Sequence, residues 1–387
     1  MAAFPSPRLP WRRILRFLHL WVGLIRGVPL VLIGITGSVL VFEHELDALL
    51  NPELHRASAG EPRPIDDIVA AARSAVPAGS QPMMFVAPES SGDAATVRFA
   101  PPGRNAPGPG GLQVFVDPES LSVLGARDSS ASVLRQIFML HANLLVRDRS
   151  GREAVGWLGV VMLALGISGM VLWWPTHGRW GPAFRVKWSA RGMRFHRELH
   201  GAVGIWSWAV FMVVSFTGVY IVFPQSVGAG LSAMVPTVDR PPVSEIRVTP
   251  AEGVEQIGFN QAAALAQADL GDARLRTVGL PMRPDQPVRV GLAHADADPG
   301  APAITVFVDP WTAHVLEVRD PRSYSVGESV MAWQRPLHYG IGLGWLWRIP
   351  VFLSGLLPLL FVVTGFYLWL LKRRARRTAV ARRVPAE

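Results

Sequence analysis

Histidines are the residues of this chain best suited to chemistry at a fixed site, and ten are present among its 387 residues. Two of them, His196 and His200, are four positions apart in the stretch RFHRELHGAVG. This spacing places both imidazoles on one face of a helix. The stretch is not an HExxH zinc motif, because its glutamate is the third residue of HRELH and not the second. A structural zinc would also need further ligands nearby, and the basic sequence around the pair offers none.

An internal duplication gives one of these two histidines a distant counterpart. HLWVG at 19–23 matches HGAVG at 200–204, and a Thr-Gly step follows the histidine of each motif after 17 residues. The duplication therefore aligns His19 with His200 and leaves His196 without a partner.

A second pair of histidines is matched in the same way. MLHANLL at 139–145 corresponds to PLHYGIG at 336–342, and each stretch precedes an apolar segment. His141 is therefore the counterpart of His338. The two halves of the chain each supply one histidine at the start of their first apolar segment and another shortly before their second.

Two imidazoles from different helices, on either side of an apolar slot, suit the axial positions of a b-type haem. We expect two b haems, one held near the inner membrane face by His19 and His200 and the other near the outer face by His141 and His338. Histidines at the ends of membrane helices also occur as plain interfacial residues. The sequence alone leaves that alternative open.

Two further residues are candidates for a supporting role. His196 lies one helical turn before His200 and is expected to lie beside the haem or to act as an alternative ligand. Arg26 lies seven residues after His19, on roughly the same helix face. An arginine within a membrane span is costly and usually paired, and a haem propionate is one such partner. The remaining histidines are expected on the surface or in loops: His44, His55, His177, His294 and His314.

The histidines are positioned by four apolar segments, each long enough for a bilayer core, which needs about 20 residues. Half of all residues are hydrophobic, which indicates a membrane protein. None of the four segments contains Asp or Glu, which counts against an ion-coupled transporter. The expected layout is a cytoplasmic N-terminus (1–16), spans at 17–42, 154–174, 201–223 and 349–371, outer domains at 43–153 and 224–348, a basic cytoplasmic loop at 175–200 and a basic cytoplasmic tail at 372–387.

The net charge of +9 is concentrated beside the expected spans. Basic residues precede the first span, fill the loop at 175–200 and form the KRRARR run after the fourth span. Basic flanks mark the cytoplasmic side, so both termini are expected in the cytoplasm. The charge therefore indicates membrane orientation and not nucleic-acid binding. The chain contains no cysteine, which excludes iron–sulfur clusters, CxxCH-attached haem and disulfides.

The two long loops between the spans each have an α+β pattern. Helix-like runs at 65–76 and 260–271 precede short alternating strands such as TVRFA and VRVGLA. The loops also share the motif VFVDP, in which Asp-Pro is expected to start a turn. The fold class is therefore a four-helix transmembrane bundle, made of two parallel repeats of two spans, with two outer α+β domains.

These motifs resemble the PepSY-associated transmembrane helix family, which includes iron-regulated membrane proteins and siderophore-iron reductases of the bacterial inner membrane. The resemblance covers residues from about 12 to 372. The motifs of the first half are HLWVG, Thr36-Gly37, VFVDP…VLGARD, MLHANLL and SGMVLWWP, and those of the second half are HGAVG, Thr217-Gly218, VFVDP…VLEVRD, PLHYGIG and TGFYLWL.

The resemblance implies periplasmic PepSY-like domains and a haem-containing reductase that passes electrons across the inner membrane to a ferric siderophore, releasing Fe(II) for uptake. The family's span-opening histidine corresponds to His19 and His200, and its Leu-His histidine to His141 and His338. Some relatives carry a fused flavodoxin-like module that this sequence lacks. The electron donor is therefore expected to be a separate cytoplasmic or membrane component.

Two other functions remain open from the sequence. The chain could be a non-enzymatic membrane protein whose PepSY domains bind peptide or regulate a protease, in which case it would carry no cofactor. It could also be a component of a siderophore permease. The absence of carboxylates in the spans and of a nucleotide-binding motif makes the permease the weaker alternative.

Overall fold

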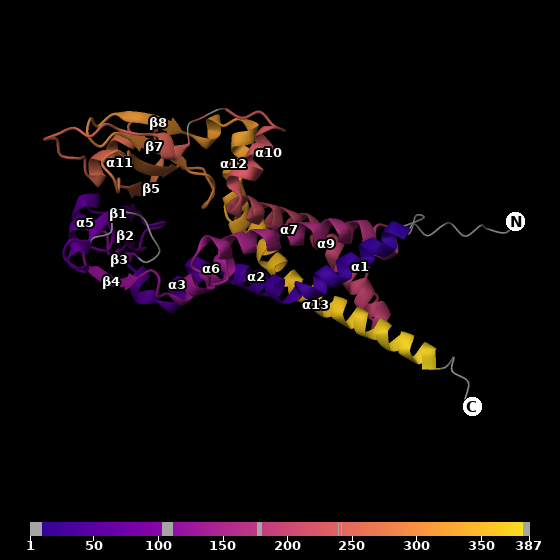
Figure 1. Ribbon diagram of the computed structural model, residues 1–387. Coiled ribbons are helices and arrows are strands. Elements are labelled where there is room, and N and C mark those ends of the chain that lie inside the picture. Colours follow the sequence, from indigo (N-terminus) through magenta and orange to yellow (C-terminus); the bar gives the residue numbers. More distant parts are fainter. Residues whose placement is uncertain (1–9, 103–110, 176–179, 239, 241, 382–387) are drawn as a thin grey trace. The chain divides into compact units, whose positions relative to one another are not determined.

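The computed structural model describes residues 10–102, 111–175, 180–238, 240 and 242–381 (Figure 1). The chain forms two compact units. The helical unit comprises Met1–Val41, Ile137–Gly228 and Leu337–Glu387, and the sheet unit comprises Phe42–Gln136 and Ala229–Pro336. All four repeat-matched histidines belong to the helical unit.

Among the described residues of the helical unit, three helices are long and apolar enough to cross a membrane: α7 (Arg149–Trp173), α9 (Gly192–Val222) and α13 (Gly344–Ala381). A fourth span is formed only if α1 (Pro10–Ile25) and α2 (Gly27–Leu40) are counted together. The first expected span is thus a bent pair, with an angle of 64° between its two helices.

The bend has a local cause in the sequence Arg26-Gly27-Val28-Pro29. Proline lacks a backbone N–H, and its ring clashes with the carbonyl four residues earlier, here that of Ile25. Arg26 has φ −92° and ψ 0°, and the new helix begins directly after it. Pro29 then lies in the first turn of α2, where proline is tolerated. The length of the apolar segment therefore predicts the span, but it does not reveal that the helix is interrupted within it.

Small residues allow the helices to approach closely. A Cβ atom added at Gly34 of α2 would lie 2.3 Å from the carbonyl oxygen of Gly355 in α13. Beside this contact the Ser38 hydroxyl donates a 2.7 Å hydrogen bond to the carbonyl of Phe352. In α7, an added Cβ at Gly156 would overlap the ring of Phe223. Close backbone approach and interhelical hydrogen bonds are what hold helices together where lipid removes the hydrophobic driving force.

The sheet unit contains one continuous eight-stranded sheet in the order β4-β3-β2-β1-β5-β6-β7-β8, antiparallel throughout. The strands are β1 (Gln81–Val86), β2 (Ala95–Ala100), β3 (Leu112–Val116), β4 (Val123–Asp128), β5 (Arg274–Gly279), β6 (Val288–Ala293), β7 (Ile304–Val308) and β8 (Val315–Arg319). We call β1–β4 with their connections the first lobe, and β5–β8 with theirs the second lobe. Each expected α+β domain corresponds to one lobe.

The two lobes join at β1 and β5, where Phe85 lies opposite Val278. Helices α5 (Ile65–Arg73) and α11 (Phe259–Gln267) cover one face of the sheet and share its apolar core. The two helices also cap each other. Asp66 accepts hydrogen bonds from the backbone N–H groups of Phe259 and Asn260, and the Asn260 side chain accepts one from Ile65. Each helix N-terminus thus satisfies backbone donors of the other.

Shorter helices complete both units. They are α3 (Glu43–Leu50), α4 (Pro52–His55), α6 (Val133–Asn143), α8 (Trp180–Ala183), α10 (Pro224–Ser232), η1 (Val243–Glu245), η2 (Pro321–Ser323) and α12 (Val326–Tyr339). The VFVDP motifs form turns, as the sequence predicts. Asp117 accepts hydrogen bonds from the backbone of Glu119 and Ser120, and Asp309 accepts one from that of Trp311.

Candidate functional site

The four repeat-matched histidines lie in two pairs. The ring centroids of His19 in α1 and His200 in α9 are 6.3 Å apart. Those of His141 in α6 and His338 in α12 are 6.1 Å apart. The structure therefore brings together residues that are separated by nearly half the chain, in the pairing that the duplication suggests. That these histidines hold a haem stays a prediction.

The His19–His200 pair is held by hydroxyl groups on the two neighbouring spans. Nδ1 of His19 lies 2.8 Å from the Ser168 hydroxyl on α7, and Nδ1 of His200 lies 2.7 Å from the Thr364 hydroxyl on α13. Thr364 uses its own proton to donate to the carbonyl of Leu360, so its oxygen accepts from His200. Ser168 donates similarly to Leu165. The protonated nitrogen of each ring is therefore Nδ1.

The His141–His338 pair is held by backbone carbonyls. Nδ1 of His141 donates to the carbonyl of Ile33 at 2.9 Å, and Nδ1 of His338 donates to that of Val214 at 3.0 Å. A carbonyl can only accept, so these rings too carry their proton on Nδ1. The Thr36 and Thr217 hydroxyls lie 3.3 and 3.1 Å from the same nitrogens.

A glycine next to three of the four hydroxyl residues lies against the ring of the histidine. A Cβ atom added at Gly37 would lie 2.9 Å from Cε1 of His141, and one at Gly218 would lie 3.0 Å from Cε1 of His338. At Gly169 the corresponding distance to Cε1 of His19 is 3.4 Å. Each of the four histidines thus contacts a hydroxyl residue on another helix that is followed by a glycine, and in three cases the ring also lies against that glycine; a Cβ atom added at Gly365, the fourth glycine, would have no neighbour within 4 Å. We call these the Ser/Thr-Gly steps: Thr36-Gly37, Ser168-Gly169, Thr217-Gly218 and Thr364-Gly365.

The Ser/Thr-Gly steps are the functional residues that reasoning from the sequence missed. Thr36-Gly37 and Thr217-Gly218 served only to align the two halves, and Ser168 and Thr364 received no role. The sequence does contain a signal that could have found them. Four Ser/Thr-Gly steps recur at matched positions of the two halves, and the number of matched histidines is also four. Hydrogen bonding of Nδ1 is the usual way to fix a metal-binding histidine, which gives that count a physical meaning.

The donor set fits an ion held between two imidazoles. With Nδ1 engaged in each ring, Nε2 carries the free lone pair. With metal–nitrogen bonds of about 2.0 Å and ring centres about 1.1 Å further out, two histidines on opposite sides of one ion have centroids about 6.2 Å apart, whereas adjacent tetrahedral positions give about 5 Å. The separations of 6.3 and 6.1 Å match the first arrangement. The two histidines of each pair would therefore be able to hold one haem between them.

The surroundings of the His19–His200 pair also suit a flat cofactor. Gly23 and Gly204 lie one helical turn after His19 and His200 on the same helix faces. A Cβ atom added at Gly23 would have no neighbour within 4 Å, and one at Gly204 would touch only the Phe361 ring at 3.8 Å. Both helices therefore present bare backbone next to the imidazoles, which allows a macrocycle to lie against them.

His196 is not part of the histidine pairs. Its ring stacks on Tyr367 of α13 with centroids 5.0 Å apart and planes within 3° of each other. Its Nδ1 is buried and has no hydrogen-bond partner among the described residues. The duplication gives His196 no counterpart. In the structure it lies one helical turn before His200, and its ring contacts Tyr367, whereas the ring of His200 contacts Phe361.

Arg26 lies at the break between α1 and α2, where it precedes the first residue of α2. The residue is exposed at this position, and its backbone N–H and carbonyl continue the hydrogen-bond pattern of the two helices. Contact with a propionate therefore remains a prediction for this side chain.

Two histidines that were expected on the surface or in loops are largely buried and hydrogen-bonded. His55 in the first lobe lies 3.0 Å from Asp47, and His294 in the second lobe lies 2.8 Å from Asp320. His44 packs edge-on against His55. These contacts belong to the sheet unit and stabilise the lobes. His314 is exposed, and His177 falls outside the described residues.

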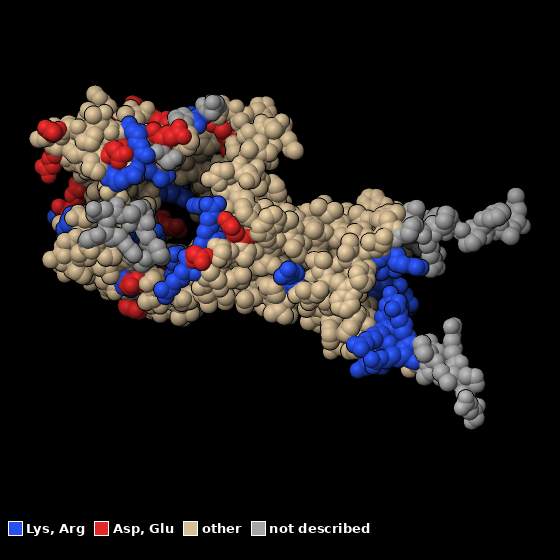
Figure 2. All heavy atoms as spheres, viewed as in Figure 1, with Lys and Arg blue, Asp and Glu red and all other residues tan. Residues whose placement is uncertain are grey.

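Basic side chains gather at one end of the helical unit, around the start of α1 and the end of α13 (Figure 2). The α13 residues at this end, from Lys372 to Arg377, are exposed. Such a cluster beside apolar helices is the pattern of a membrane surface contact. The helices are therefore flanked by positive charge at the end where α1 begins and α13 ends.

The sequence was compared with protein-family models and with curated proteins. No curated protein gives a significant match. The model of the PepSY-associated TM region matches residues 16–372, which includes both histidine pairs, all four Ser/Thr-Gly steps and the entire sheet unit. With apolar helices of spanning length and a match over nearly all of its residues, the chain belongs to the PepSY-associated TM region family of membrane proteins.

Proposed function

We propose that the protein is a di-haem b electron conduit of the bacterial inner membrane that reduces ferric siderophores in the periplasm. The observation that supports this most is the arrangement of the two histidine pairs, each with Nδ1 hydrogen-bonded and Nε2 free at a ring separation of 6.1–6.3 Å. His19 with His200, and His141 with His338, would be the axial ligands. Bound haem would supply one-electron redox chemistry at each position.

The chain's own residues act by holding the imidazoles. The Ser168 and Thr364 hydroxyls and the Ile33 and Val214 carbonyls fix the tautomer that presents Nε2. A hydrogen bond to Nδ1–H also raises the basicity of the ligating nitrogen, which favours the oxidised iron. The apolar residues of the spans would keep water from a bound haem and so influence its reduction potential.

The two pairs are placed at different depths by the same helix. In α9, His200 is followed after 17 residues by Thr217, which contacts His338 of the other pair. At 1.5 Å per residue the two levels are about 25 Å apart along the helix axis. That distance is most of a bilayer core of about 30 Å. Two redox centres at these levels would divide the path across the membrane.

The direction of electron flow follows from charge. The basic end of the helical unit would face the cytoplasm, where a separate reductant would deliver electrons to the His19–His200 pair. Electrons would leave from the His141–His338 pair on the periplasmic side. Reduction of Fe(III) to Fe(II) weakens its binding by hard oxygen donors, since the lower charge loosens a site built for the ferric ion.

The test uses the full chain, produced with ample haem and purified in detergent. A dithionite-reduced minus oxidised spectrum should show Soret and α-band changes typical of b haem. After removal of excess dithionite under anaerobic conditions, a ferric siderophore should return the protein to its oxidised spectrum while a ferrous chelator traps Fe(II). The gallium complex of the same siderophore is the matched control, because Ga(III) accepts no electron. A protein without haem would rule the proposal out.

A further inference from the structure

The two faces of the eight-stranded sheet carry different residues. Helices α5 and α11 pack on the apolar face, which includes Val97 and Val290. Residues that alternate with these along the strands lie on the opposite face. On that opposite face, one row of cross-strand partners crosses the four central strands: Arg98 in β2, Met84 in β1, Gly279 in β5 and Arg289 in β6. One arginine therefore lies on each side of the junction between the two lobes, and we call these two the central arginines.

Both central arginines are open to a ligand. Arg98 and Arg289 are exposed, and among the described residues neither guanidinium group has a hydrogen bond or an ion pair. The Arg289 guanidinium lies over the ring of Phe307, 5.8 Å from its centroid, and this contact leaves its N–H donors unused. Each of the two groups can therefore offer a fork of donors to an anion.

Each central arginine has another arginine as a neighbour. Desolvation by the surrounding protein, and secondly the charge of Arg135, lower the pKa of Arg98, while the charge of Glu43 opposes them. Desolvation, and secondly the charge of Arg319, lower the pKa of Arg289. A bound anion would stabilise both guanidinium groups against these neighbours, because opposite charges at short range favour the charged form.

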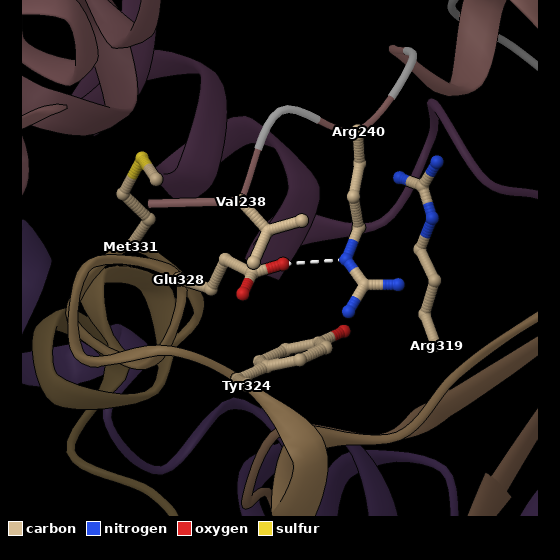
Figure 3. A pocket seen from close by; sticks show the side chains of 6 residues that line it. All are labelled: Val238, Arg240, Arg319, Tyr324, Glu328 and Met331. Atoms are coloured by element: carbon tan, nitrogen blue, oxygen red, sulfur yellow. Dashed lines mark hydrogen bonds and ion pairs between the residues drawn. The ribbon is translucent and has the colours of Figure 1, made fainter. Parts of the chain in front are cut away.

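Three other arginines of the sheet unit are already paired with carboxylates. Their hydrogen bonds link Arg127 to Asp47, Arg319 to Glu317 and Arg240 to Glu328. Figure 3 shows the last of these bonds, with the Arg319 side chain next to Arg240. A guanidinium group whose donors are engaged by a carboxylate has fewer left for a further anion. The central arginines are therefore the better candidates for ligand binding.

The row between the central arginines consists of small or flexible residues. Gly279 has no side chain, and a Cβ atom added there would have its nearest neighbour at 3.7 Å. Met84 beside it is unbranched and polarisable, which lets it adapt to a ligand. With strands about 4.8 Å apart, the Cα atoms of Arg98 and Arg289 are about 14 Å apart. This separation suits a ligand with anionic groups on two sides better than a single small anion.

We propose that the two central arginines bind an anionic ferric chelate over Met84 and Gly279, through carboxylate or catecholate oxygen pairs, so that the protein prefers negatively charged ferric siderophores; the inference rests on the proposed function. An arginine fork matches two adjacent anionic oxygens, and such charge-assisted bonds are among the strongest in proteins. The arginines come from different lobes, so a ligand between them uses both copies of the repeat. A neutral iron complex would gain little from this site.

The first-lobe side of this site is connected to the outer histidine pair by one helix. Arg135, the arginine whose charge acts on Arg98, lies on α6. His141 follows on the same helix six residues later, about 9 Å along its axis. A chelate at the central arginines would therefore lie near the start of the helix that bears a histidine of the proposed electron exit.

The experiment measures binding without electron transfer, using the full chain in detergent and gallium complexes as redox-inert probes. Titration calorimetry would compare the Ga(III) complex of a hexadentate tris-catecholamide, with a charge of −3, with the neutral Ga(III) complex of a hexadentate tris-hydroxamate. We expect the anionic complex to bind at least about tenfold more tightly than the neutral one, since each charge-assisted hydrogen bond contributes about tenfold or more. Equal affinities for the two would overturn the proposal.

Variants locate the binding. Arg98→Gln and Arg289→Gln should each weaken binding of the anionic complex about tenfold and leave the affinity for the neutral complex unchanged. Arg98→Lys, which keeps the charge but loses the fork, should fall between. Arg73→Gln is the matched control, because it removes an exposed arginine of α5, a helix on the opposite face of the sheet. If Arg73→Gln weakens binding as much as Arg98→Gln does, the effect is one of net charge and the proposed site is wrong.

The haem content of the same preparations separates this inference from the proposed function. Binding of the anionic complex that depends on both central arginines, in a protein without haem, would support the anion site and rule out the reductase. Normal haem spectra with no preference for the anionic complex would leave the reductase standing and rule out the anion site. Each pair of measurements therefore decides one proposal independently of the other.

Discussion

The two halves of the chain build their histidine sites alike and their sheet lobes differently. In both halves a histidine at the start of the first span faces a Ser/Thr-Gly step on a neighbouring span, and a Leu-His histidine faces a Thr-Gly step. In the first lobe Arg127 of β4 pairs with Asp47 of α3, whereas in the second lobe Arg319 pairs with Glu317 on its own strand.

The contrast separates the helical unit from the sheet unit. Each histidine pair takes one histidine from each half of the chain, so both halves must supply the same hydrogen bonds to hold it. The helical unit therefore uses the duplication as a symmetric pair, whereas the two lobes of the sheet unit hold their matched arginines, Arg127 and Arg319, through different partners.

The largest effect is expected where a side chain would occupy the space of a ring. Gly218→Val should displace His338, because a Cβ atom there already lies 3.0 Å from the ring. Gly37→Val should displace His141 in the same way. Each variant should lose about half of the bound haem in a pyridine haemochrome assay. Gly230→Ala, a helical glycine with no neighbour within 4 Å of its Cβ, serves as the control. If only one of the two variants loses haem, the two halves do not contribute equally to the His141–His338 pair.

A smaller effect should follow the loss of the hydroxyl acceptors. Thr364→Val and Ser168→Ala remove the acceptor of Nδ1 in His200 and His19, and such partners typically change metal affinity about 10- to 100-fold. Thr217→Val should cost less, because the Val214 carbonyl still accepts from His338. Haem transfer to apo-myoglobin would measure the affinities. Equal losses in Thr364→Val and Thr217→Val would contradict the assignment of the carbonyl as the main acceptor.

The first lobe should be more sensitive to the loss of Asp47 than the second lobe is to the loss of Glu317. Asp47→Asn breaks the link between Asp47 in α3 and Arg127 in β4, which are 80 residues apart in sequence. The change should destabilise the contact between α3 and β4 by about 1–3 kcal/mol. Glu317→Gln breaks a pair between neighbours on one strand and releases no contact between distant segments, so a smaller destabilisation of about 0.5–1 kcal/mol is expected. Hydrogen exchange of α3 and β8 would compare the two. A larger opening of β8 in Glu317→Gln would reverse the comparison.

Acid should act on the same link. Burial acts to raise the pKa of Asp47, but the hydrogen bonds and charge of Arg127, together with His55, outweigh it and hold that pKa below the ordinary 3.8. A carboxylate with a depressed pKa in the folded state contributes stability that is fully present above its unfolded pKa and is lost as the pH falls through the folded one. Protection of α3 should therefore persist at pH 5 and decline below about pH 4. In Asp47→Asn the decline should be smaller.

The smallest effect is expected at the turn after the Leu-His histidines. Leu145 and Gly342 both lie four residues after their histidine, and both have positive φ, 61° and 86°. A leucine in the left-handed conformation costs about 1–2 kcal/mol of strain. Glycine avoids this strain but loses more backbone entropy on folding, so only part of the cost is recovered. Leu145→Gly should thus stabilise the protein by about 0.5–1 kcal/mol, and Gly342→Ala should destabilise it by a similar amount. Thermal unfolding in detergent would show whether the two shifts have opposite signs.

Much of the fold could be predicted because its signals are local. Apolar length gave the spans, alternation gave strands such as β2 and β6, and the motif repeats aligned His19 with His200. The bend at Arg26 was missed because apolar content does not record the backbone hydrogen bond that Pro29 cannot donate to Ile25. The joining of β1 to β5 was missed because edge pairing depends on partners nearly 200 residues apart. The roles of Ser168 and Thr364 were missed because a hydrogen bond between helices leaves no local pattern.

The most direct test of the central claim is the number of haems per chain in the wild type and in one variant from each histidine pair. The account predicts two haems in the wild type, one in His19→Ala, one in His338→Ala and none in the double variant. His314→Ala, at an exposed position, should keep both. A chain that binds no haem, or a double variant that still binds two, would contradict the account.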